Sequence, residues 1–295
     1  MQNYQPAILD PVPPLARYVF FSVASTHVAQ LQQALGRLST LADGQQLVVG
    51  LGTPLLDMLG GRVVGMHDFV PLQGLGVQVP STPCALCCWL RGGDAGALLH
   101  LTRRLQQALA PALQLDQVVE AFRYNSGRDL TGYEDGTENP QGDAASAAAL
   151  VQGAPAGRTG SSFMVVQQWL HHLDAFDAMG SAAQDNMIGR RRSDNAELDD
   201  APPSAHVKRT AQESFAPEAF VLRRSMPWAQ GQRCGLMFVA FGCSFDAFEA
   251  QMRRMVGLDD QILDGLFAIS APLTGMHFWC PPMNQGRLDW RALGF

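Results

Sequence analysis

The chain of 295 residues has little charge, because Asp, Glu, Lys and Arg together make up only 16% of it, against about 25% in an average soluble protein. The charges sum to −6. A strongly basic nucleic-acid binder is therefore excluded, since nothing would neutralise many phosphates. Hydrophobic residues reach 47%, which excludes a chain that is disordered throughout. We infer that a subunit interface or a buried apolar ligand covers part of the surface.

Long apolar runs are also missing, and cysteines are few. No stretch reaches the roughly 18 uninterrupted apolar residues that cross a bilayer, and the first residues lack the basic and apolar segments of a secretory signal. Only Cys84 and Cys87 have the spacing of a metal or redox pair. In the apolar run CALCCWL they would lie on opposite faces of a strand, and no second pair completes a zinc site. We expect a cytoplasmic protein with reduced thiols and no membrane partner.

Two stretches, residues 84–109 and 234–258, share one pattern. Each starts with an apolar run of strand length and continues through a glycine-containing turn into an amphipathic helix. Asp94 and Ser244 are the candidate N-caps of these helices. The chain before each stretch also matches: a strand within residues 17–25 leads into a helix with a stripe of Val28, Leu31, Leu35, Leu38 and Leu41, and residues 161–176 offer another strand and a possible helix.

This repetition predicts an α+β fold, built as a duplicated unit with antiparallel sheets backed by peripheral helices. We place the two halves at residues 1–145 and 146–295. They meet near residues 139–160, which are rich in Gly, Ala, Pro and Ser. That composition favours a connection or a lid over a core element.

Three clusters of polar residues could carry chemistry. Residues 132–140, Gly-Tyr-Glu-Asp-Gly-Thr-Glu-Asn-Pro, form a turn by local physics. Residues 188–192 and 204–207 bring three successive arginines and then His206; the arginines could be a solvated loop or an anion clamp, and a lone histidine is more often structural. Residues 221–228 contain the pair Arg223-Arg224, whose simplest interpretation is a surface strand.

Together the clusters present one carboxylate, one imidazole and one guanidinium. Such a set can bind a metal centre through the histidine and leave the acid and the cation for the opposite face. The other histidines offer no competing site. His171 and His172 would point about 100° apart on a helix. The rest have no ligand-like partners nearby in the sequence, and they are His27, His67, His100 and His277.

At these residues the sequence resembles the dye-decolorizing peroxidase family of haem enzymes, and most of all its compact bacterial B-type class. The GxxDG signature is matched by Gly132–Gly136, the stretch before the proximal histidine by residues 189–190 and 204–207, and the distal-arginine segment by Val221–Trp228. The resemblance covers essentially the whole chain in order and spacing. It implies two ferredoxin-like halves arranged as a dimeric α+β barrel, in agreement with the duplication.

The resemblance also implies a cofactor, haem b, and roles for particular residues. His206 would be the metal ligand, with the carboxylate of Asp264 as the candidate acceptor of its N–H. Asp135, Arg223 and Ser225 would be the catalytic groups on the distal side, with Arg223 preferred over Arg224 because it lies four residues before Pro227. Further cofactor contacts are expected from Arg190, at a propionate, and from Gly136 and Thr137. Two positions deserve mention. Tyr133 replaces the Phe that is usual in the GxxDG segment, and Ser225 stands at a distal position that varies between Asn and Ser in the family.

The implied function is a haem-dependent peroxidase that reduces hydrogen peroxide and oxidises dyes, phenolics or other organic reductants through a high-valent iron–oxo state. Asp135 would move a proton between the peroxide oxygens, and Arg223 would stabilise the developing anion; we expect Arg223 to matter more. A homo-oligomer is implied as well. Two alternatives stay open: oxidation of porphyrinogens in haem metabolism at the same site, and a non-enzymatic haem carrier.

Overall fold

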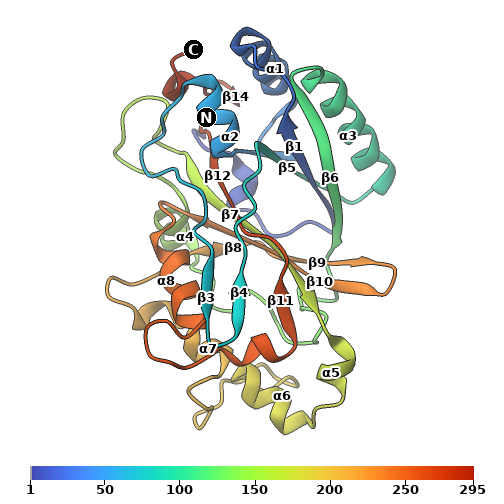
Figure 1. Cartoon of the computed structure of the whole chain (residues 1–295), viewed down its shortest axis with the longest axis vertical. Coiled ribbons are helices and arrows are strands. Elements are labelled where there is room, and N and C mark those ends of the chain that lie inside the picture. Colours follow the sequence, from blue (N-terminus) through green and yellow to red (C-terminus); the bar gives the residue numbers. More distant parts are fainter. Residues whose placement is uncertain (1) are drawn as a thin grey trace.

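The structure, a computed structural model, describes residues 2–295 as an α+β fold of antiparallel strands and surrounding helices (Figure 1). The first half comprises η1 (Pro6–Ile8), β1 (Leu15–Val23), α1 (Val28–Leu41), β2 (Leu47–Leu51), α2 (Thr53–Leu59), β3 (Leu72–Gly74), β4 (Val77–Val79), β5 (Leu86–Gly92), α3 (Ala95–Leu109), β6 (Leu113–Phe122) and α4 (Gly142–Ala149). The second comprises β7 (Ser162–His171), α5 (Leu173–Asp177), α6 (Ser181–Ile188), α7 (His206–Arg209), η2 (Gln212–Ser214), β8 (Leu222–Arg223), β9 (Met226–Gln230), β10 (Arg233–Gly242), α8 (Asp246–Met255), η3 (Gly265–Ala268), β11 (Ser270–Pro272), β12 (Met276–Cys280), β13 (Met283–Asn284), β14 (Arg287–Leu288) and η4 (Arg291–Leu293).

One large antiparallel sheet runs through both halves. The first half places its strands in the order β2-β5-β1-β6, and the second in the order β12-β7-β10-β9. A single residue pair joins the halves on each side, Trp279 with Leu51 and Ala121 with Trp228. Since β7 pairs with both β12 and β10, the pairings close into a ring, with β8 and β11 attached to β10 and β7.

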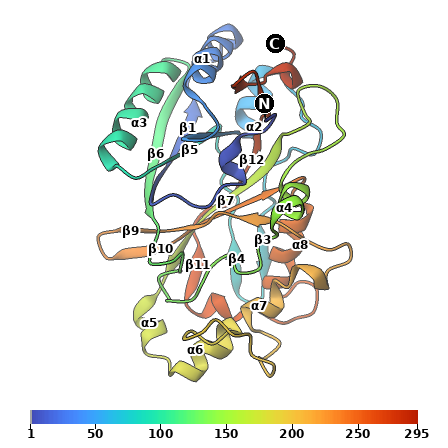
Figure 2. The ribbon, with the colours of Figure 1, turned by 180° about the vertical axis from the view of Figure 1, so that it is seen from behind.

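The alternation of side chains along the strands creates two cores. Val19 and Phe21 of β1 pack with the buried stripes of α1 and α3, while Tyr18 and Phe20 face the opposite side of the sheet. Figure 2 shows α1 and α3 side by side against β1, β5 and β6. The predicted stripe of α1 is buried at Leu31, Leu35 and Leu38, whereas Val28, at the first turn, remains 41% exposed.

The repeated strand–turn–helix pattern appears as β5–α3 and β10–α8. Oδ1 of Asp94 accepts a 2.7 Å hydrogen bond from the backbone N–H of Ala97, as expected of an N-cap. The prediction at Ser244 is wrong by one residue, because α8 has Phe245 as its N-cap. The Ser244 hydroxyl instead accepts from the N–H of Asp246 at 3.3 Å.

Two further expectations need correction. Residues 139–160 are more than a connection, since they contain α4, whose Ala145 and Ala149 are buried against the second core. Small side chains let this helix lie close to β10, and the carbonyl of Ala148 accepts from the N–H of Cys243. The predicted helix near residue 171 is also shorter than its sequence indicates: His171 is the last residue of β7, and α5 follows with one short turn.

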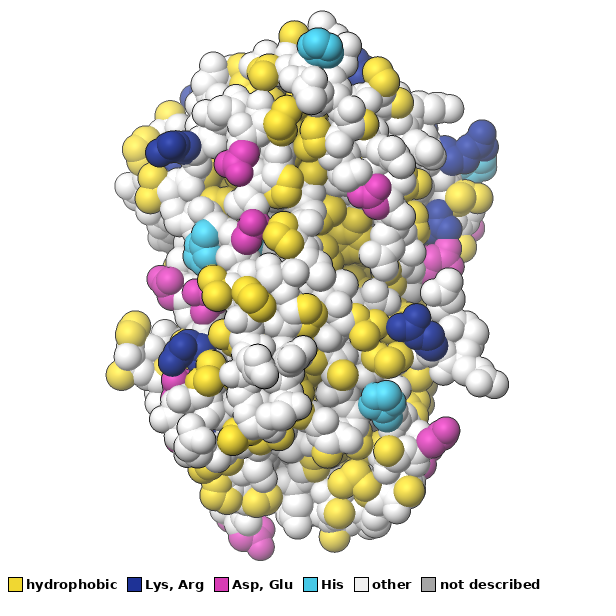
Figure 3. Space-filling model, viewed as in Figure 1, with side chains coloured by type: hydrophobic (Ala, Val, Ile, Leu, Met, Phe, Trp, Pro, Cys, Tyr) yellow, Lys and Arg dark blue, Asp and Glu magenta, His cyan; other side chains and the backbone are white. Residues whose placement is uncertain are grey.

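The outer surface reflects the low charge of the chain. Charged side chains are scattered singly or in small groups over the face seen in Figure 3, with wide stretches of apolar and uncharged atoms between them. Across residues 2–295, no helix combines the length and the hydrophobicity that crossing a membrane requires.

Candidate functional site

The GxxDG segment forms an irregular loop between β6 and α4. Gly132 and Gly136 both have positive φ, +86° and +78°, a conformation that favours glycine. A Cβ on Gly136 would also lie 2.8 Å from Nδ2 of Asn139. Glycine at this position therefore allows the loop to turn tightly, so that Asp135 and Asn139 both point toward β8.

Asn139 attaches this loop to the backbone of Arg223. Its Nδ2 donates to the carbonyl of Arg223 at 3.0 Å, and its Oδ1 accepts from the N–H of Arg223 at 2.8 Å. The side-chain amide thus makes the two hydrogen bonds to the backbone of Arg223 that a neighbouring strand would otherwise make. They fix the position of Arg223 relative to the loop that carries Asp135.

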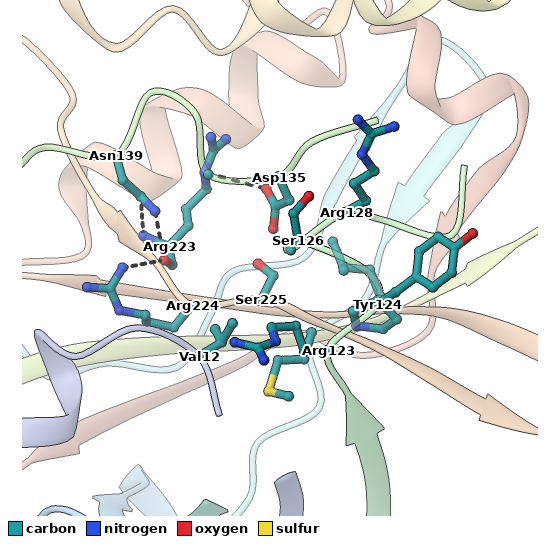
Figure 4. Close-up of a pocket in the computed structure, with 15 residues that line it drawn as sticks. Val12, Arg123, Tyr124, Ser126, Arg128, Asp135, Asn139, Arg223, Arg224 and Ser225 are labelled. Carbon is teal, nitrogen blue, oxygen red and sulfur yellow. Dashed lines mark hydrogen bonds and ion pairs between the residues drawn. The ribbon is translucent and has the colours of Figure 1, made fainter. Parts of the chain in front are cut away.

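Asp135 and Arg223 face each other across a small cavity, with Nε of Arg223 4.0 Å from Oδ1 of Asp135 (Figure 4). Both side chains are largely buried. Arg224 points away from this pair: its guanidinium donates to the carbonyls of Leu9 and Arg223. Burial, and to a smaller extent Arg91, lowers the pKa of Arg224 to about 10. The structure thus brings Arg223, and not Arg224, to Asp135.

Ser225 lines the same cavity, two residues along the chain from Arg223 and on the same face (Figure 4). It is 8% exposed, and its hydroxyl oxygen accepts from the N–H of Val239 at 3.4 Å. The hydroxyl hydrogen is free to donate into the cavity.

His206, the first residue of α7, is held by Asp264. Nδ1 of His206 lies 2.8 Å from Oδ2 of Asp264, and a carboxylate can only accept, so Nδ1 carries the proton. Asp264 is 1% exposed, and its other oxygen accepts from the N–H of Leu266 at the start of η3. Nε2 of His206 has no hydrogen-bond partner among the described residues, and its lone pair is available to a ligand.

These groups lie together in one region of the molecule. Asp135, Arg223 and His206 line two adjoining cavities, and Asp135 and Arg223 also line a third with Ser225. The cavity with the most apolar walls holds about 560 Å³ of space, part of it open to solvent. Its apolar walls come from Leu236, Phe238, Phe248, Met252, Met255 and Leu266.

The residues present fit an iron porphyrin. The group needs an axial donor, and the imidazole of His206 offers a free Nε2 while its other nitrogen is bound to a carboxylate, the arrangement typical of metal-binding histidines. It also needs apolar walls for its ring, which Phe248 and its neighbours supply. Asp135, Arg223 and His206 all line this cavity.

Arg190 and Thr137 lie at the edge of the second cavity. Arg190 donates to Glu138 at 2.5 Å and to Glu197 at 2.9 Å, so its charge is already shared between two carboxylates. The hydroxyl of Thr137 accepts from Nδ2 of Asn195. Arg190 is thus a member of an ion-pair network beside the cavity, where a further anion would have to share it with Glu138 and Glu197.

The structure adds a buried polar group that the sequence did not indicate. Nε2 of His171 lies 2.9 Å from Asp129 and Nδ1 lies 2.7 Å from the hydroxyl of Ser270, and both His171 and Ser270 line the cavity of His206. Burial acts to raise the pKa of Asp129, but hydrogen bonds and charge from His171, with Thr131, outweigh it and lower that pKa. The three residues lie far apart in the chain, and no sequence pattern links them.

Asn139 was also missed as a functional residue. Its sequence context indicates only the end of a turn before Pro140. The signal that could have found it is its place three residues after Gly136, where a side-chain amide can reach the next strand.

The chain is similar to known proteins in sequence and in fold. Residues 126–285 match the family model described as "Dyp-type peroxidase, C-terminal". A dye-decolorizing peroxidase of Rhodococcus erythropolis is 32% identical over 266 residues, which cover 86% of this chain and 76% of the relative. A variant of DypB from Rhodococcus jostii RHA1, solved in complex with heme, superposes with a TM-score of 0.84 at 27% identity and covers 93% of this chain and 95% of its own. A dye-decolorizing protein from V. cholerae superposes with a TM-score of 0.81 at 27% identity, covering 93% and 96%.

Proposed function

Since the chain belongs to the Dyp-type peroxidase family, we propose that it is a haem peroxidase, which reduces hydrogen peroxide and oxidises an organic donor such as a dye or a phenol. The observation that carries this function is the meeting of His206, with its free Nε2, and the pair Asp135–Arg223 on one cavity. The overall reduction adds two electrons and two protons to hydrogen peroxide and yields two molecules of water. The organic donor supplies the electrons.

His206 would hold the cofactor through Nε2. When bound there, haem supplies an iron that exchanges electrons with peroxide and with the donor. Asp264 keeps Nδ1 of His206 protonated and strengthens the imidazole as an electron donor. Gly136, Thr137 and Arg190 would contact the edge of the group, with Arg190 at a carboxylate of the cofactor.

Arg223 and Asp135 would divide the work on peroxide. The guanidinium of Arg223 stabilises a peroxide anion and the departing hydroxide through its positive charge and its N–H donors, and it is not a proton shuttle. Asp135 accepts the proton from one peroxide oxygen and returns it to the other, which requires that both oxygens lie within hydrogen-bond reach of its carboxylate. Ser225 adds a donor to the same space.

The test begins with the absorption spectrum of the haem-loaded protein and its change on rapid mixing with peroxide. We expect a Soret band, a fast spectral change, and turnover of a dye or phenol. His206→Ala should lose the haem or bind it without the wild-type spectrum. A wild-type protein that does not load haem would refute the proposal.

The same experiment separates the two alternatives. A haem carrier would load haem but show no fast reaction with peroxide, and the acid–cation pair at the cavity argues against it. An enzyme of porphyrin metabolism would oxidise a porphyrinogen faster than a dye. Either outcome would replace the proposed function while leaving the haem site in place.

Finer features of the molecule belong to the proposal as well. We propose that residues 1–145 and 146–295 are two ferredoxin-like halves, supported by the matching strand order in each. We also propose a homo-oligomer, which the sparse surface charge supports, and a cytoplasmic location. The latter is supported by the cysteines of residues 2–295, all six of which are free thiols.

A further inference from the structure

Three side chains outside the haem cavity meet at the junction of the two halves. The sequence offered no ligand-like partners for His67 or His277, and that expectation is wrong: both lie next to Glu249. His67 comes from the chain between α2 and β3, Glu249 from α8, and His277 from β12. One ring nitrogen of each histidine and one carboxylate oxygen lie within 4.8 Å of one another. We propose that these three side chains bind a divalent transition-metal cation, and that Zn²⁺ suits them best.

In both imidazoles Nδ1 lies beside a backbone carbonyl, which leaves Nε2 for a ligand. Nδ1 of His67 lies 3.1 Å from the carbonyl of Gly65, and Nδ1 of His277 lies 3.1 Å from the carbonyl of His67. Carbonyls can only accept, so both Nδ1 atoms carry a proton and both Nε2 atoms have a lone pair when the rings are neutral. Histidines that bind metals are usually oriented in this way, by donating the other N–H to a carbonyl or a carboxylate.

His277 supplies an independent indication of a ligand. The residue is 2% exposed, and its Nε2 is buried without a hydrogen-bond partner among residues 2–295. An unsatisfied buried nitrogen is costly, and a cation at this nitrogen would remove that cost. The ring stacks on Phe245 at a centroid distance of 3.7 Å, with Phe69 and Phe248 at its edges, so its orientation is fixed before any metal arrives.

His67 and Glu249 lie on the solvent side of the site, and Glu249 supplies its negative charge. Nε2 of His67 and Oε1 of Glu249 lie 2.7 Å apart, although a neutral His67 whose Nδ1 carries the proton would have only a lone pair to present there. Two lone pairs would repel each other at this distance, and a cation between the two atoms would remove that repulsion. The side chains are 44% and 30% exposed, so the ion has a path from solvent.

This donor set is selective among cations. Two imidazoles and one carboxylate are a common zinc set, with about 2.0–2.2 Å from metal to each ligand and a fourth position for water. Mg²⁺ and Ca²⁺ prefer a shell of oxygens and are disfavoured. A bound ion would tie the chain between α2 and β3 to α8 and β12, which lie near one another in both ribbon views (Figures 1 and 2).

The experiment measures zinc per protein chain on the full-length, haem-loaded, tag-free protein after exposure to one equivalent of Zn²⁺ with excess Mg²⁺, followed by desalting. We expect about one zinc per chain for the wild type. His67→Ala and Glu249→Gln should each retain less zinc than the wild type, by about tenfold or more. His100→Asn, which removes an exposed histidine on α3, is the matched control and should behave as the wild type.

A second measurement distinguishes loss of the metal site from misfolding of a variant. Zn²⁺ should raise the thermal midpoint of the wild type and of His100→Asn, but not that of Glu249→Gln, because the cation binds only the folded site. Circular dichroism identifies any variant that fails to fold. The proposal is overturned if the wild type retains no zinc, or if folded His67→Ala and Glu249→Gln retain as much as the wild type. Neither result depends on peroxidase activity.

Discussion

Arg223 and Arg224 are adjacent in the sequence but have different surroundings. Side chains alternate along an extended chain, so only one of the two can face the cavity. Alternation does not say which one, and the preference for Arg223 came from its distance to Pro227 in a family pattern. In the structure, Arg224 is bound to the carbonyl of Leu9, 215 residues away in sequence. Such a contact depends on the whole fold and has no local signal.

At this scale we predict that Arg223→Ala lowers the second-order rate with hydrogen peroxide by about 10²–10³-fold, because the charge that stabilises the developing anion is lost. Asp135→Ala should lower it less. Stopped-flow mixing of haem-loaded variants with peroxide measures both rates, and Arg224→Gln is the control for loss of a neighbouring positive charge. A larger effect of Asp135→Ala would reverse the assignment.

At the scale of helices and strands, the sequence predicted the site only in part. The GxxDG turn, the strands β5 and β10 and the helices α3 and α8 follow from local pattern. The loop's attachment to β8 does not, since it rests on the amide of Asn139, and a sequence shows only that an amide follows the turn. The helix α4 was missed for a related reason: its alanines resemble a linker until a partner surface buries them.

For the attachment of the loop we predict that Asn139→Ala slows the reaction with peroxide by about tenfold or more, because small displacements of a positioned charge are costly. Asn139→Asp keeps the acceptor for the Arg223 N–H and loses the donor, so its peroxide rate should lie between the rates of the wild type and of Asn139→Ala. Haem content, read from the Soret band, should not change. An unchanged peroxide rate in Asn139→Ala would show that Arg223 is positioned by other contacts.

For the turn itself we predict that Gly136→Ala lowers the free energy of unfolding by about 1–3 kcal/mol, through strain at positive φ together with the contact to Asn139. Gly153→Ala is the matched control, since Gly153 has a φ of +64° but the part of the chain that the structure describes places no atom within 4 Å of the added Cβ. Urea unfolding of both variants separates strain from the steric contact. Equal losses would mean that Asn139 moves aside freely.

At the scale of the molecule, the duplication that we propose was suggested by the sequence, because two stretches repeat one order of strand, turn and helix. The joining of the halves was not. Within the sheet the halves meet through single residue pairs between β12 and β2 and between β6 and β9, and both hydrophobic cores contain residues from each half. The same holds for the group of His171, Asp129 and Ser270, which connects the loop before the GxxDG turn to β7 and β11.

This connection predicts an acid sensitivity. Because the folded pKa of Asp129 lies below its usual value of 3.8, its stabilising contribution is complete above that value and is lost as the pH falls toward the folded pKa. Asp129→Asn should lower the free energy of unfolding by roughly 1–3 kcal/mol near neutral pH. The difference from the wild type should shrink as the solution is acidified through the carboxyl range. Urea unfolding across pH measures it, and a difference that does not change with pH would contradict the prediction.

The 4.0 Å between Nε of Arg223 and Oδ1 of Asp135 has a kinetic meaning. A pair in direct contact would have to separate before either group could bind a reactant, and that separation would add to the barrier of every cycle. At 4.0 Å the two charges attract each other, yet each keeps its own hydrogen-bonding capacity. An arriving peroxide therefore competes only with solvent for these groups. The affinity that it gains is not reduced by an internal bond that must first be broken.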